Sequence, residues 1–521
     1  MIALYVRLLF ITIILGFGPQ LIATDMPLTT ITVTIDRGRD VGQSFGSLFE
    51  VASEDGQLVI GAGFQNLYNT AYRADRHAVE FFIRPNSGER KLEQTALPRP
   101  NELCGTYLYS QDGVVHSTYG GNRVLHPESM TWREEPAIGG TEETMRVGRG
   151  VLAFGNSSVT YDGHTILAPP EQGEYRLFYY ADGYLCFYHV NRKEGAYRPY
   201  SNDADGFSKL YACPWTPGEP KVDLSRAIVL SLPVVGETTF AWGQLGDQIV
   251  TGSNIGGFYV FQDGAWKILL QPNIAVSYQL YSTMAFHDRL LMGQYPTGRL
   301  FEYDGEKIID RVGWPPKLDG VSASAREAQT TVIYGGDMFV GVWPWGELWR
   351  YNPDSDKWTF SQRMFDHPAL TDKVVHPYEE ENHGNPVGNH WGQRVTSLVT
   401  AGNGLFVSTS AKSPSVWNPE QNPFLAPDKW KSYGTVYRLT MPGHLSATTN
   451  WTDGPTTLEF TIRGSQIEIR QDGQQLAAAI VTGPLAEQLR SLRKLKPVTW
   501  GTGIYGKFRG QAINGSITIG P

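Results

Sequence analysis

The sequence predicts an all-β protein: a β-propeller of seven or eight blades with a small β-rich appendage at the C-terminal end. One observation is a pattern written in several copies, each with an apolar run, a glycine-bearing loop, an aromatic-rich strand, an acidic turn and a closing strand. Clear copies occupy residues 248–269, 289–309 and 338–360. A second observation is composition: the 57 Gly, 26 Tyr, 23 Phe and 14 Trp among 521 residues are typical of short aromatic strands joined by tight turns.

Each copy is a small sheet that cannot bury both faces alone, so it must stack against its neighbours around an axis. Aligning the second strand of every unit yields eight candidates, one of which is allowed to be an irregular hairpin. The eight candidates are 57–63, 114–121, 151–157, 185–193, 248–254, 290–296, 338–344 and 405–411. Counting therefore predicts seven or eight blades.

The chain begins with the features of an export signal. Residues 1–23 carry Arg7 near the start, an apolar run over 8–17 and a small residue, Ala23, at the end. This layout is typical of a cleaved secretory signal peptide, and the apolar run is short for a membrane span. A signal anchor is the alternative. We expect a secreted or periplasmic protein with no membrane attachment once the signal is removed.

The propeller is predicted to occupy residues 31–448. Its opening blade begins near Ile31 and contains the strand at 57–63, with 78–85 and 91–97 as outer strands. Each of these segments alternates apolar and polar residues and is bounded by Gly, Asp or Asn, as expected for strands of a small sheet.

The repeated spacing of strands and turns changes after residue 448, and residues 449–521 are predicted to form a separate β-rich module. The segment 456–481 has hairpin spacing, 484–495 has the apolar spacing of a short helix, and 504–519 returns to strand. The tail is either an appended module or part of the closure of the ring.

Charge and cysteine content limit the classes of partner. The net charge of −8 gives no support for nucleic-acid binding, so an anionic ligand would need a local basic cluster. Cys104, Cys186 and Cys213 are too few for a disulfide framework, and their odd number leaves at least one thiol unpaired. No motif for an organic cofactor is present, and we expect a monomer.

The loops after the second strand of each blade are expected to open on one face of the ring, where propellers usually bind ligands. In this sequence those loops are rich in aromatic and basic residues. Aromatic faces stack on sugar rings and Arg pairs with carboxylate or sulfate, so an anionic polysaccharide is the predicted ligand class. The alternative is that these residues pack between blades or are solvated. The candidate substrate-binding residues are Tyr119, Asn122, Arg123, Arg192, Tyr197, Tyr295, Arg299 and Trp343.

Two histidines, His116 and His189, fall near the end of the second strand of their units. At that position an imidazole points toward the central channel or its mouth, where it can act as an acid or base near neutral pH. The alternative is a structural histidine whose ring is satisfied within the core.

A second histidine pattern lies in the long connection near residue 380. His376, His383 and His390 are spaced seven residues apart. Three neutral imidazoles in an ordered insertion can bind Zn²⁺ in a structural role, or another divalent metal, with a further ligand completing the site. A solvated polar insertion is the alternative.

The chain resembles the β-propeller polysaccharide lyases, and most closely the ulvan lyases of that architecture. The resemblance rests on the export signal, the opening DRGRDVGQSFGSLFEV, the unit YLCFYHVNRKEGAYRPYSNDADGFSKLYACPWTP and the repeat GQYPTGRLFEYDG. It covers most of the expected ring, over residues 31–439. What it implies is β-elimination at a uronic acid of a sulfated, rhamnose-containing polysaccharide, giving 4,5-unsaturated products.

Such an elimination requires a group that neutralises the uronate, a base and an acid. Family members use His, Tyr and Arg in these roles, together with a structural metal. The resemblance implies His116 or His189 as base or acid, Tyr188 as the other proton-transfer group and Arg198 as the neutraliser, with His126 in reserve. Arg192, Lys193 and Arg198 could lower the pKa of a tyrosine base.

Two other functions fit the same features. One is a carbohydrate-binding propeller without catalysis, which would use the same aromatic and basic rim. The other is a metal-dependent propeller lyase acting on oligogalacturonides, in which clustered histidines hold a catalytic metal. Sensitivity to a chelator would separate these two classes.

Overall fold

The computed structural model describes residues 28–70, 74–86, 90–136, 143–191, 206–381, 389–509 and 515–520. The predicted signal peptide, residues 1–23, lies outside the described residues. Almost all regular structure in the described part is β-strand. The exceptions are α1 (Pro377–Glu381), α2 (Gly483–Ser491) and two short 3-10 turns. No helix in these ranges is both long and apolar enough to cross a membrane.

Seven antiparallel sheets follow one another along the chain and form the blades of a propeller. Blade 1 contains β7 (Tyr107–Gln111), β8 (Val114–Thr118), β9 (Arg123–His126) and β10 (Thr131–Glu134). Blade 2 contains β11 (Glu143–Val147), β12 (Gly150–Gly155), β13 (Ser158–Tyr161) and β14 (His164–Leu167). Blade 3 contains β15 (Glu174–Ala181), β16 (Tyr184–Asn191), β17 (Phe207–Pro214) and β18 (Ile228–Ser231).

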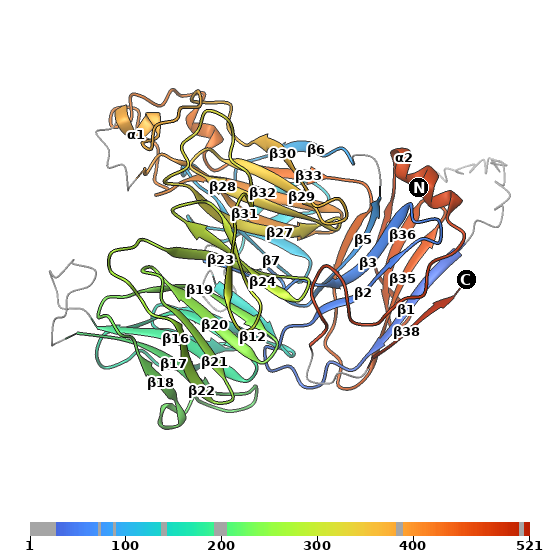
Figure 1. Ribbon diagram of the computed structural model, residues 1–521, viewed down its shortest axis with the longest axis horizontal. Helices are drawn as coiled ribbons and strands as arrows, with labels where there is room; N and C mark the ends of the chain where they lie inside the picture. Colours follow the sequence, from blue (N-terminus) through green and yellow to red (C-terminus); the bar gives the residue numbers. More distant parts are fainter. Residues whose placement is uncertain are drawn as a thin grey trace, which may run out of the picture.

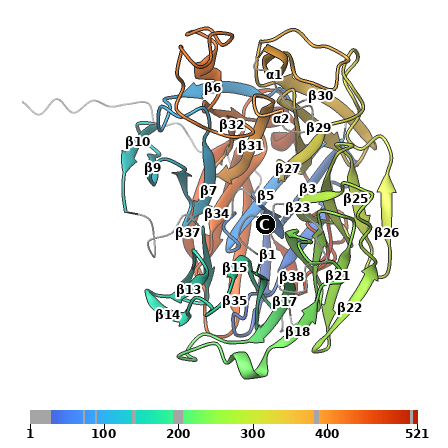
Figure 2. The same ribbon diagram turned by 90° about the vertical axis from the view of Figure 1, so that its left-hand side faces the viewer.

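Blades 4 to 7 complete the ring. They contain β19 (Thr239–Leu245), β20 (Gln248–Ser253), β21 (Phe258–Gln262) and β22 (Ala265–Leu270); β23 (Gln279–Phe286), β24 (Arg289–Tyr295), β25 (Leu300–Tyr303) and β26 (Ile308–Arg311); β27 (Glu327–Tyr334), β28 (Asp337–Trp343), β29 (Glu347–Asn352) and β30 (Lys357–Arg363); β31 (Gln393–Ala401), β32 (Gly404–Ala411), β33 (Val436–Thr440) and β6 (Glu93–Leu97). Figure 2 views the ring along its axis, and the last strands of the blades, such as β14, β18, β22 and β26, lie at the periphery.

The ring is closed by a strand from the N-terminal side of the chain. β6 pairs antiparallel with β33, with Leu97 opposite Val436, and so supplies the outer strand of blade 7. The next strand, β7, starts blade 1 and lies against β31 of blade 7. Apolar residues of both blades, including Leu108, Val399 and Phe406, bury this seam.

The remaining strands form two sheets that pack face to face as a β-sandwich, to the right of the ring in Figure 1. One sheet contains β2 (Gly46–Ala52), β3 (Leu58–Phe64), β5 (Ala78–Pro85) and β34 (His444–Thr448). The other contains β37 (Gln474–Ile480), β36 (Gln466–Gln471), β35 (Thr456–Arg463), β1 (Leu28–Ile35) and β38 (Gly515–Gly520). Alternate residues of β1 and β35, such as Ile31, Val33 and Phe460, face the shared core.

The sandwich covers one end of the ring. In every blade, the hairpin between the first and second strands hydrogen-bonds to the sandwich or to the segments joining its strands. The pairs are Asp112 with Asp75, Gly148 with Asp40, Gly183 with Val41, Gln244 with Asn66, His287 with Ile504, Gly335 with His444 and Gly402 with Ser446. The sandwich does not cover the other end of the ring, which we call the open face.

A segment between β3 and β5 leaves the sandwich and enters the ring. Its short strand β4 (Leu67–Asn69) pairs with the innermost strand of blade 5, with Asn69 opposite Ser282. It also lies against β19 and β27, the innermost strands of blades 4 and 6. The backbone amide of Thr70 donates to the carbonyl of Tyr281, 3.0 Å away. β4 thus fills the axis of the ring beneath the open face.

These pairings change the expected domain division. Seven of the eight aligned candidates are second strands of blades, but 57–63 falls on β3 of the sandwich, and 91–97 contains the closing strand of the last blade. The N-terminal strands pair with the tail beyond residue 448, so the ring occupies residues 93–440 and the sandwich has segments from both ends. Alternating strands look alike in a blade and in a sandwich, and only the pairing partner distinguishes them.

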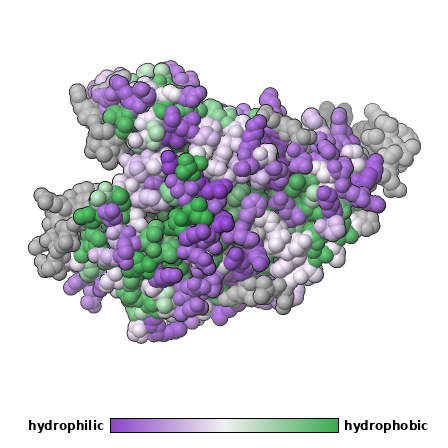
Figure 3. All heavy atoms as spheres, in the orientation of Figure 1, coloured by the Kyte–Doolittle hydropathy of each residue, from purple (hydrophilic) through white to green (hydrophobic). Residues whose placement is uncertain are grey.

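The outer surface of the ring is not uniformly polar. In Figure 3, apolar residues gather over the part of the ring where β19 to β22 lie in Figure 1. Leu270, Ile274 and Val276, on and after β22, are 42%, 63% and 42% exposed. Ile274 and Val276 lie in the connection from β22 to β23, where the Asn273 amide donates to the carbonyl of Ile255 in the β20–β21 loop, 2.8 Å away.

Candidate functional site

The open face has a charged and aromatic cluster where the innermost strands begin. We call it the axial cluster, and its members are Tyr107, Tyr281, Tyr295, Glu327, Trp343, Arg394 and Lys412. Tyr107, Tyr281, Glu327 and Arg394 each lie within the first three residues of an innermost strand, so successive blades bring them to one end of the ring. β4 lies directly beneath them.

The centre of the axial cluster is a buried ion pair between blades 6 and 7. One Arg394 nitrogen lies 3.0 and 3.2 Å from the two carboxylate oxygens of Glu327, and the side chains are 9% and 0% exposed. Burial alone lowers the pKa of Arg394, but the Glu327 carboxylate, together with Tyr281 and Tyr107, leaves this pKa raised. The guanidinium stays charged, and its charge is balanced within the cluster.

Lys412 adds a second cation to the axial cluster, close to two aromatic rings. Its ammonium nitrogen lies 4.7 Å from the ring centroid of Trp343 and 5.7 Å from that of Tyr295, within the range of cation–π attraction. The pKa of Lys412 is lowered, mainly because burial disfavours the charged form, and Arg394 acts in the same direction. The Glu327 and Glu379 carboxylates act on this pKa in the opposite direction.

Two phenols border the ion pair. Both Tyr107 and Tyr281 are half-buried, and their side chains hydrogen-bond to Arg394 and Glu327 respectively. The Tyr281 hydroxyl also contacts Gln279 Oε1. Burial raises the pKa of both phenols, and for Tyr281 the Glu327 charge raises it further. Both groups are therefore neutral hydrogen-bond donors at physiological pH.

Of the predicted substrate-binding residues, two join this cluster. Trp343 is fully buried and packs 6.3 Å from Tyr295, which is 8% exposed. Trp343 therefore supports Lys412 from below and does not present its face as a sugar platform. Arg299 lies outside the cluster, in an exposed ion pair with Asp310 at 3.1 Å.

The predicted residues of blade 1 form a separate group. Tyr119 is half-buried and packs 5.4 Å from Tyr107, so it extends the aromatic surface beside the axial cluster. Asn122 is buried and donates to the carbonyls of Glu135 and Pro136, and Arg123 donates to the carbonyl of Gly120. Asn122 and Arg123 thus hold loops in place.

The three described candidates for proton transfer by histidine are not brought together. His116, on β8, is 7% exposed and stacks on Tyr109 at 4.5 Å, and its pKa is lowered by burial. His126 ends β9 in the same blade. His189 lies on β16 in blade 3, so the whole of blade 2 separates it from His116.

His189 nevertheless borders a surface depression of about 570 Å³ that also involves Tyr175, Phe207 and Lys221. Its Nε2 lies 2.9 Å from the Gln172 carbonyl oxygen, which fixes the ring orientation, and burial lowers its pKa.

Tyr188 is fully buried, and its hydroxyl donates to the Glu237 carbonyl at 2.5 Å. Arg192, Tyr197 and Arg198 lie outside the described residues. Tyr188 therefore faces the core and leaves no room for a sugar at its hydroxyl.

The predicted metal ligands lie in two different environments. His376 is 1% exposed against Trp345 at 4.9 Å, and burial lowers its pKa to about 3. His390 is exposed and pairs with Ser413. His383 lies outside the described residues, and within those residues no three His, Cys, Asp or Glu side chains gather as a metal site. The described donors alone do not make a zinc site.

Sequence reasoning overestimated the basicity of the rim and missed its acidic partners. Arg326, another arginine between blades, donates to Glu347 at 3.0 Å, with both side chains almost fully buried. Glu327 neutralises Arg394 in the same way. Tyr107 and Tyr281 were missed because they begin first strands, whereas the search followed loops after second strands. Their place beside β31 and β27 follows only from the closed ring.

Comparisons with known proteins show no family for this chain. No family model matches the chain, and no curated protein matches it. The chain is similar in structure to the β-propeller domain of Cps50 (Swd1) from Myceliophteria thermophila, with 10% identity, a TM-score of 0.34, and 62% of this chain and 99% of that chain covered.

Two further similar structures are YCF48 bound to D1 peptide and BamB from Moraxella catarrhalis. For YCF48 the identity is 11% and the TM-score 0.32, with 68% of this chain and 96% of that chain covered. For BamB the values are 12% and 0.28, with 78% and 96% covered. Function is therefore argued from the residues of this chain.

Proposed function

We propose that this protein binds an acidic polysaccharide on the open face of its propeller, through the axial cluster. The observation that carries the proposal is Lys412, whose ammonium lies over Trp343 and Tyr295 beside an ion pair that is already balanced. Lys412 and Arg394 place two cations among the aromatic rings of this face, and a uronate is a sugar whose carboxylate is attracted to such cations.

The surroundings of Lys412 suit the rest of a sugar. Tyr107, Tyr119 and Tyr281 are half-buried, so part of each ring is open to solvent for contact with a pyranose. The neutral phenols of Tyr107 and Tyr281 can donate to or accept from sugar hydroxyls. Because β4 fills the axis below, the saccharide would lie across the open face. An exported location, secreted or periplasmic, agrees with such a ligand and is part of this proposal.

Titration calorimetry tests the binding. Saturable binding is expected for uronic-acid oligosaccharides and not for neutral oligosaccharides of equal length. Lys412→Met should weaken the binding at least about tenfold, or about 1.4 kcal/mol, because it keeps the apolar stem and removes the charge. Lys357→Met, on exposed β30, is the matched control and should bind like the wild type. Equal affinity in both variants would contradict the proposal.

A second candidate, β-elimination at the bound uronate, is favoured by one observation. The pKa of Lys412 is lowered while that of Tyr281 is raised, which suits an amine that accepts a proton and a phenol that donates one. In this step a base takes the proton from C5, the C4–O bond breaks as the C4=C5 bond forms, and an acid protonates the leaving oxygen. The substrate implied by the sequence resemblance is ulvan.

The ultraviolet absorbance of the unsaturated uronyl product tests elimination directly. We expect it to rise with ulvan and to remain flat with pectic, alginate and glycosaminoglycan substrates. Tyr281→Phe should then lower the turnover number while leaving binding by calorimetry nearly unchanged. If the absorbance stays flat while the saccharide binds, the protein is a carbohydrate-binding propeller without catalysis.

A further inference from the structure

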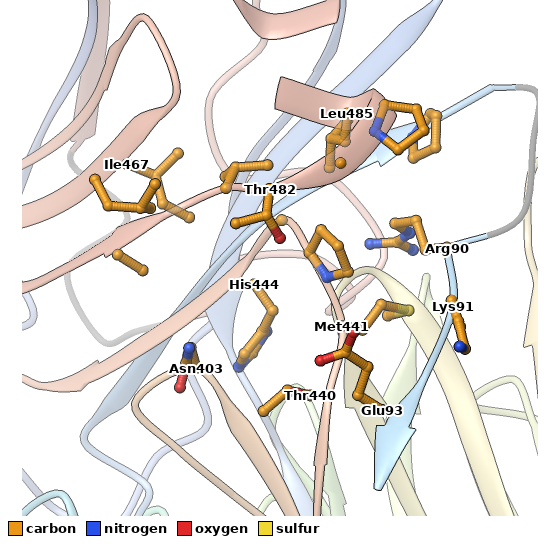
Figure 4. Close-up of a pocket in the computed structure, with 18 of the residues that line it drawn as sticks. Arg90, Lys91, Glu93, Asn403, Thr440, Met441, His444, Ile467, Thr482 and Leu485 are labelled. Carbon is orange, nitrogen blue, oxygen red and sulfur yellow. The ribbon is translucent and has the colours of Figure 1, made fainter. Parts of the chain in front are cut away.

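A pocket of about 590 Å³ lies at the junction of blade 7 and the sandwich and shares no described lining residue with the axial cluster. Its walls come from the end of β37, the first turn of α2, the link between β33 and β34, and the start of β6. Figure 4 shows Thr482 and Leu485 on one side of this space and Arg90, Met441 and Glu93 on the other. The ring and the sandwich therefore build the pocket together.

The floor of the pocket is apolar without being aromatic. Met441, Val481 and Leu485 are buried and line it, together with Pro442 and Ala479. None of the lining residues that the structure describes is a Phe, Tyr or Trp. The pocket therefore lacks a stacking platform for a sugar and suits a small apolar body.

The rim of the pocket carries a net positive charge. Lys91 is exposed, and Arg438 is held toward Asn403 by a hydrogen bond of 2.6 Å, while Glu93 is the one carboxylate among the described lining residues. Arg90 also lines the pocket, but its guanidinium is balanced by buried Asp337 at 2.8 Å. Two cations face one carboxylate, so the rim favours a monoanion.

The polar back wall does not oppose an anion. His444 is 1% exposed, and its Nδ1 accepts a hydrogen bond from the Gly335 amide at 3.1 Å, so Nε2 carries the proton. This Nε2 lies 3.0 Å from Glu80, a carboxyl outside the pocket lining. The imidazole is neutral and its position is fixed from behind.

We infer that this pocket binds an amphiphilic monoanion, with an apolar alkyl or aromatic body on Met441, Val481 and Leu485 and a carboxylate or sulfonate between Lys91 and Arg438. The inference does not depend on the function proposed for the open face. A ligand in this pocket touches both the closing strand of the ring and the sandwich. It therefore stabilises the junction and raises the melting temperature with the logarithm of its concentration above the Kd.

The fluorescent sulfonate 8-anilinonaphthalene-1-sulfonate is a suitable probe, used with the full-length protein. We expect saturable binding at one site and a rise in melting temperature. Lys91→Glu with Arg438→Glu should weaken the binding at least fivefold, and Ala479→Trp should block it sterically. The matched control reverses two exposed cations elsewhere, Arg133→Glu with Lys267→Glu, and should bind like the wild type.

Wild-type affinity in either pocket variant, or no saturable binding to the wild type, would overturn the inference. Competition identifies the apolar body: displacement by decanoate indicates an alkyl carboxylate, and displacement by 1-naphthoate an aromatic one. Displacement by neither would overturn the assignment of a carboxylate ligand. Lys412→Met should leave probe binding unchanged, so failure at this pocket is distinguishable from failure at the open face.

Discussion

Asp40 joins the sandwich to blade 2 through a fully buried carboxylate, and Asp40→Asn should destabilise the protein by about 3–5 kcal/mol. The carboxylate lies 2.5 Å from an Arg76 nitrogen, 3.0 Å from His77 Nε2 and 2.5 Å from the Gly148 amide nitrogen. Burial alone raises the pKa of Asp40, but Arg76 and these hydrogen bonds hold it well below its usual range. The group is therefore charged in the folded protein.

The magnitude follows from what asparagine leaves behind. The amide has the same shape but no charge, so Arg76, at 14% exposure, and Arg37, at 2%, lose their buried counter-charge. Removing one partner of a buried pair costs about 3–5 kcal/mol, against a total stability of about 5–15 kcal/mol. Because the pKa of Asp40 is depressed in the fold, its contribution is present above pH about 4 and is lost as the pH falls through the folded value.

Differential scanning calorimetry at neutral pH measures this effect. The control is Arg149→Ala, which removes the ion pair with Asp453 at 2.8 Å. This pair also connects blade 2 to the sandwich, but its side chains are 77% and 85% exposed. Exposed pairs contribute little, so the control should melt with the wild type. Equal melting temperatures for Asp40→Asn and Arg149→Ala would refute the claim that the buried network holds the two parts together.

Three further outcomes are expected. Burial raises the pKa of Glu80 to about 8, so the contribution of this carboxyl to stability is lost as the pH rises toward that value. Glu80→Gln should therefore flatten the decline in the urea midpoint between pH 5 and 8. Parallel midpoint profiles for the variant and the wild type would contradict this. Tyr188→Phe should lower stability by about 1 kcal/mol without changing any eliminating activity, whereas lost activity at unchanged stability would place Tyr188 in the chemistry. Zinc bound by His376, His383 and His390 stays a prediction. Elemental analysis should find a stoichiometric amount of zinc in the wild type and less zinc in His390→Ala. Wild-type protein without metal would contradict the prediction.

The repeating strands could be predicted from the sequence because each blade has its own turn residues at the ends of its strands. Local turns and strand alternation located seven second strands correctly, from β8 to β32. The same reasoning put β3 in the ring, since its alternation resembles that of a blade. Its partners β2 and β5 hydrogen-bond within the sandwich, and β34 comes from the far end of the chain. Long-range pairing of this kind leaves no local signal.

The candidate site was readable only in part for the same reason. Tyr295 and Trp343 were found because they end second strands, but burial of Trp343 depends on how blades 5 and 6 pack. The sequence analysis named no carboxylate on this face, although Glu327 neutralises Arg394, which lies 67 residues away in the chain. Residue type and spacing therefore placed Tyr295 and Trp343 on the open face, and the balance of charge on that face required the closed ring.

Hydrogen exchange with and without a uronic-acid oligosaccharide tests most directly whether the open face is the binding site. Binding there should slow exchange in the segments around Tyr281, Arg394 and Lys412, and leave the sandwich strands β35 to β37 unchanged. Lys412→Met should remove that protection at the same saccharide concentration. Protection confined to the sandwich, or to the depression beside His189, would contradict the assignment of the axial cluster as the site.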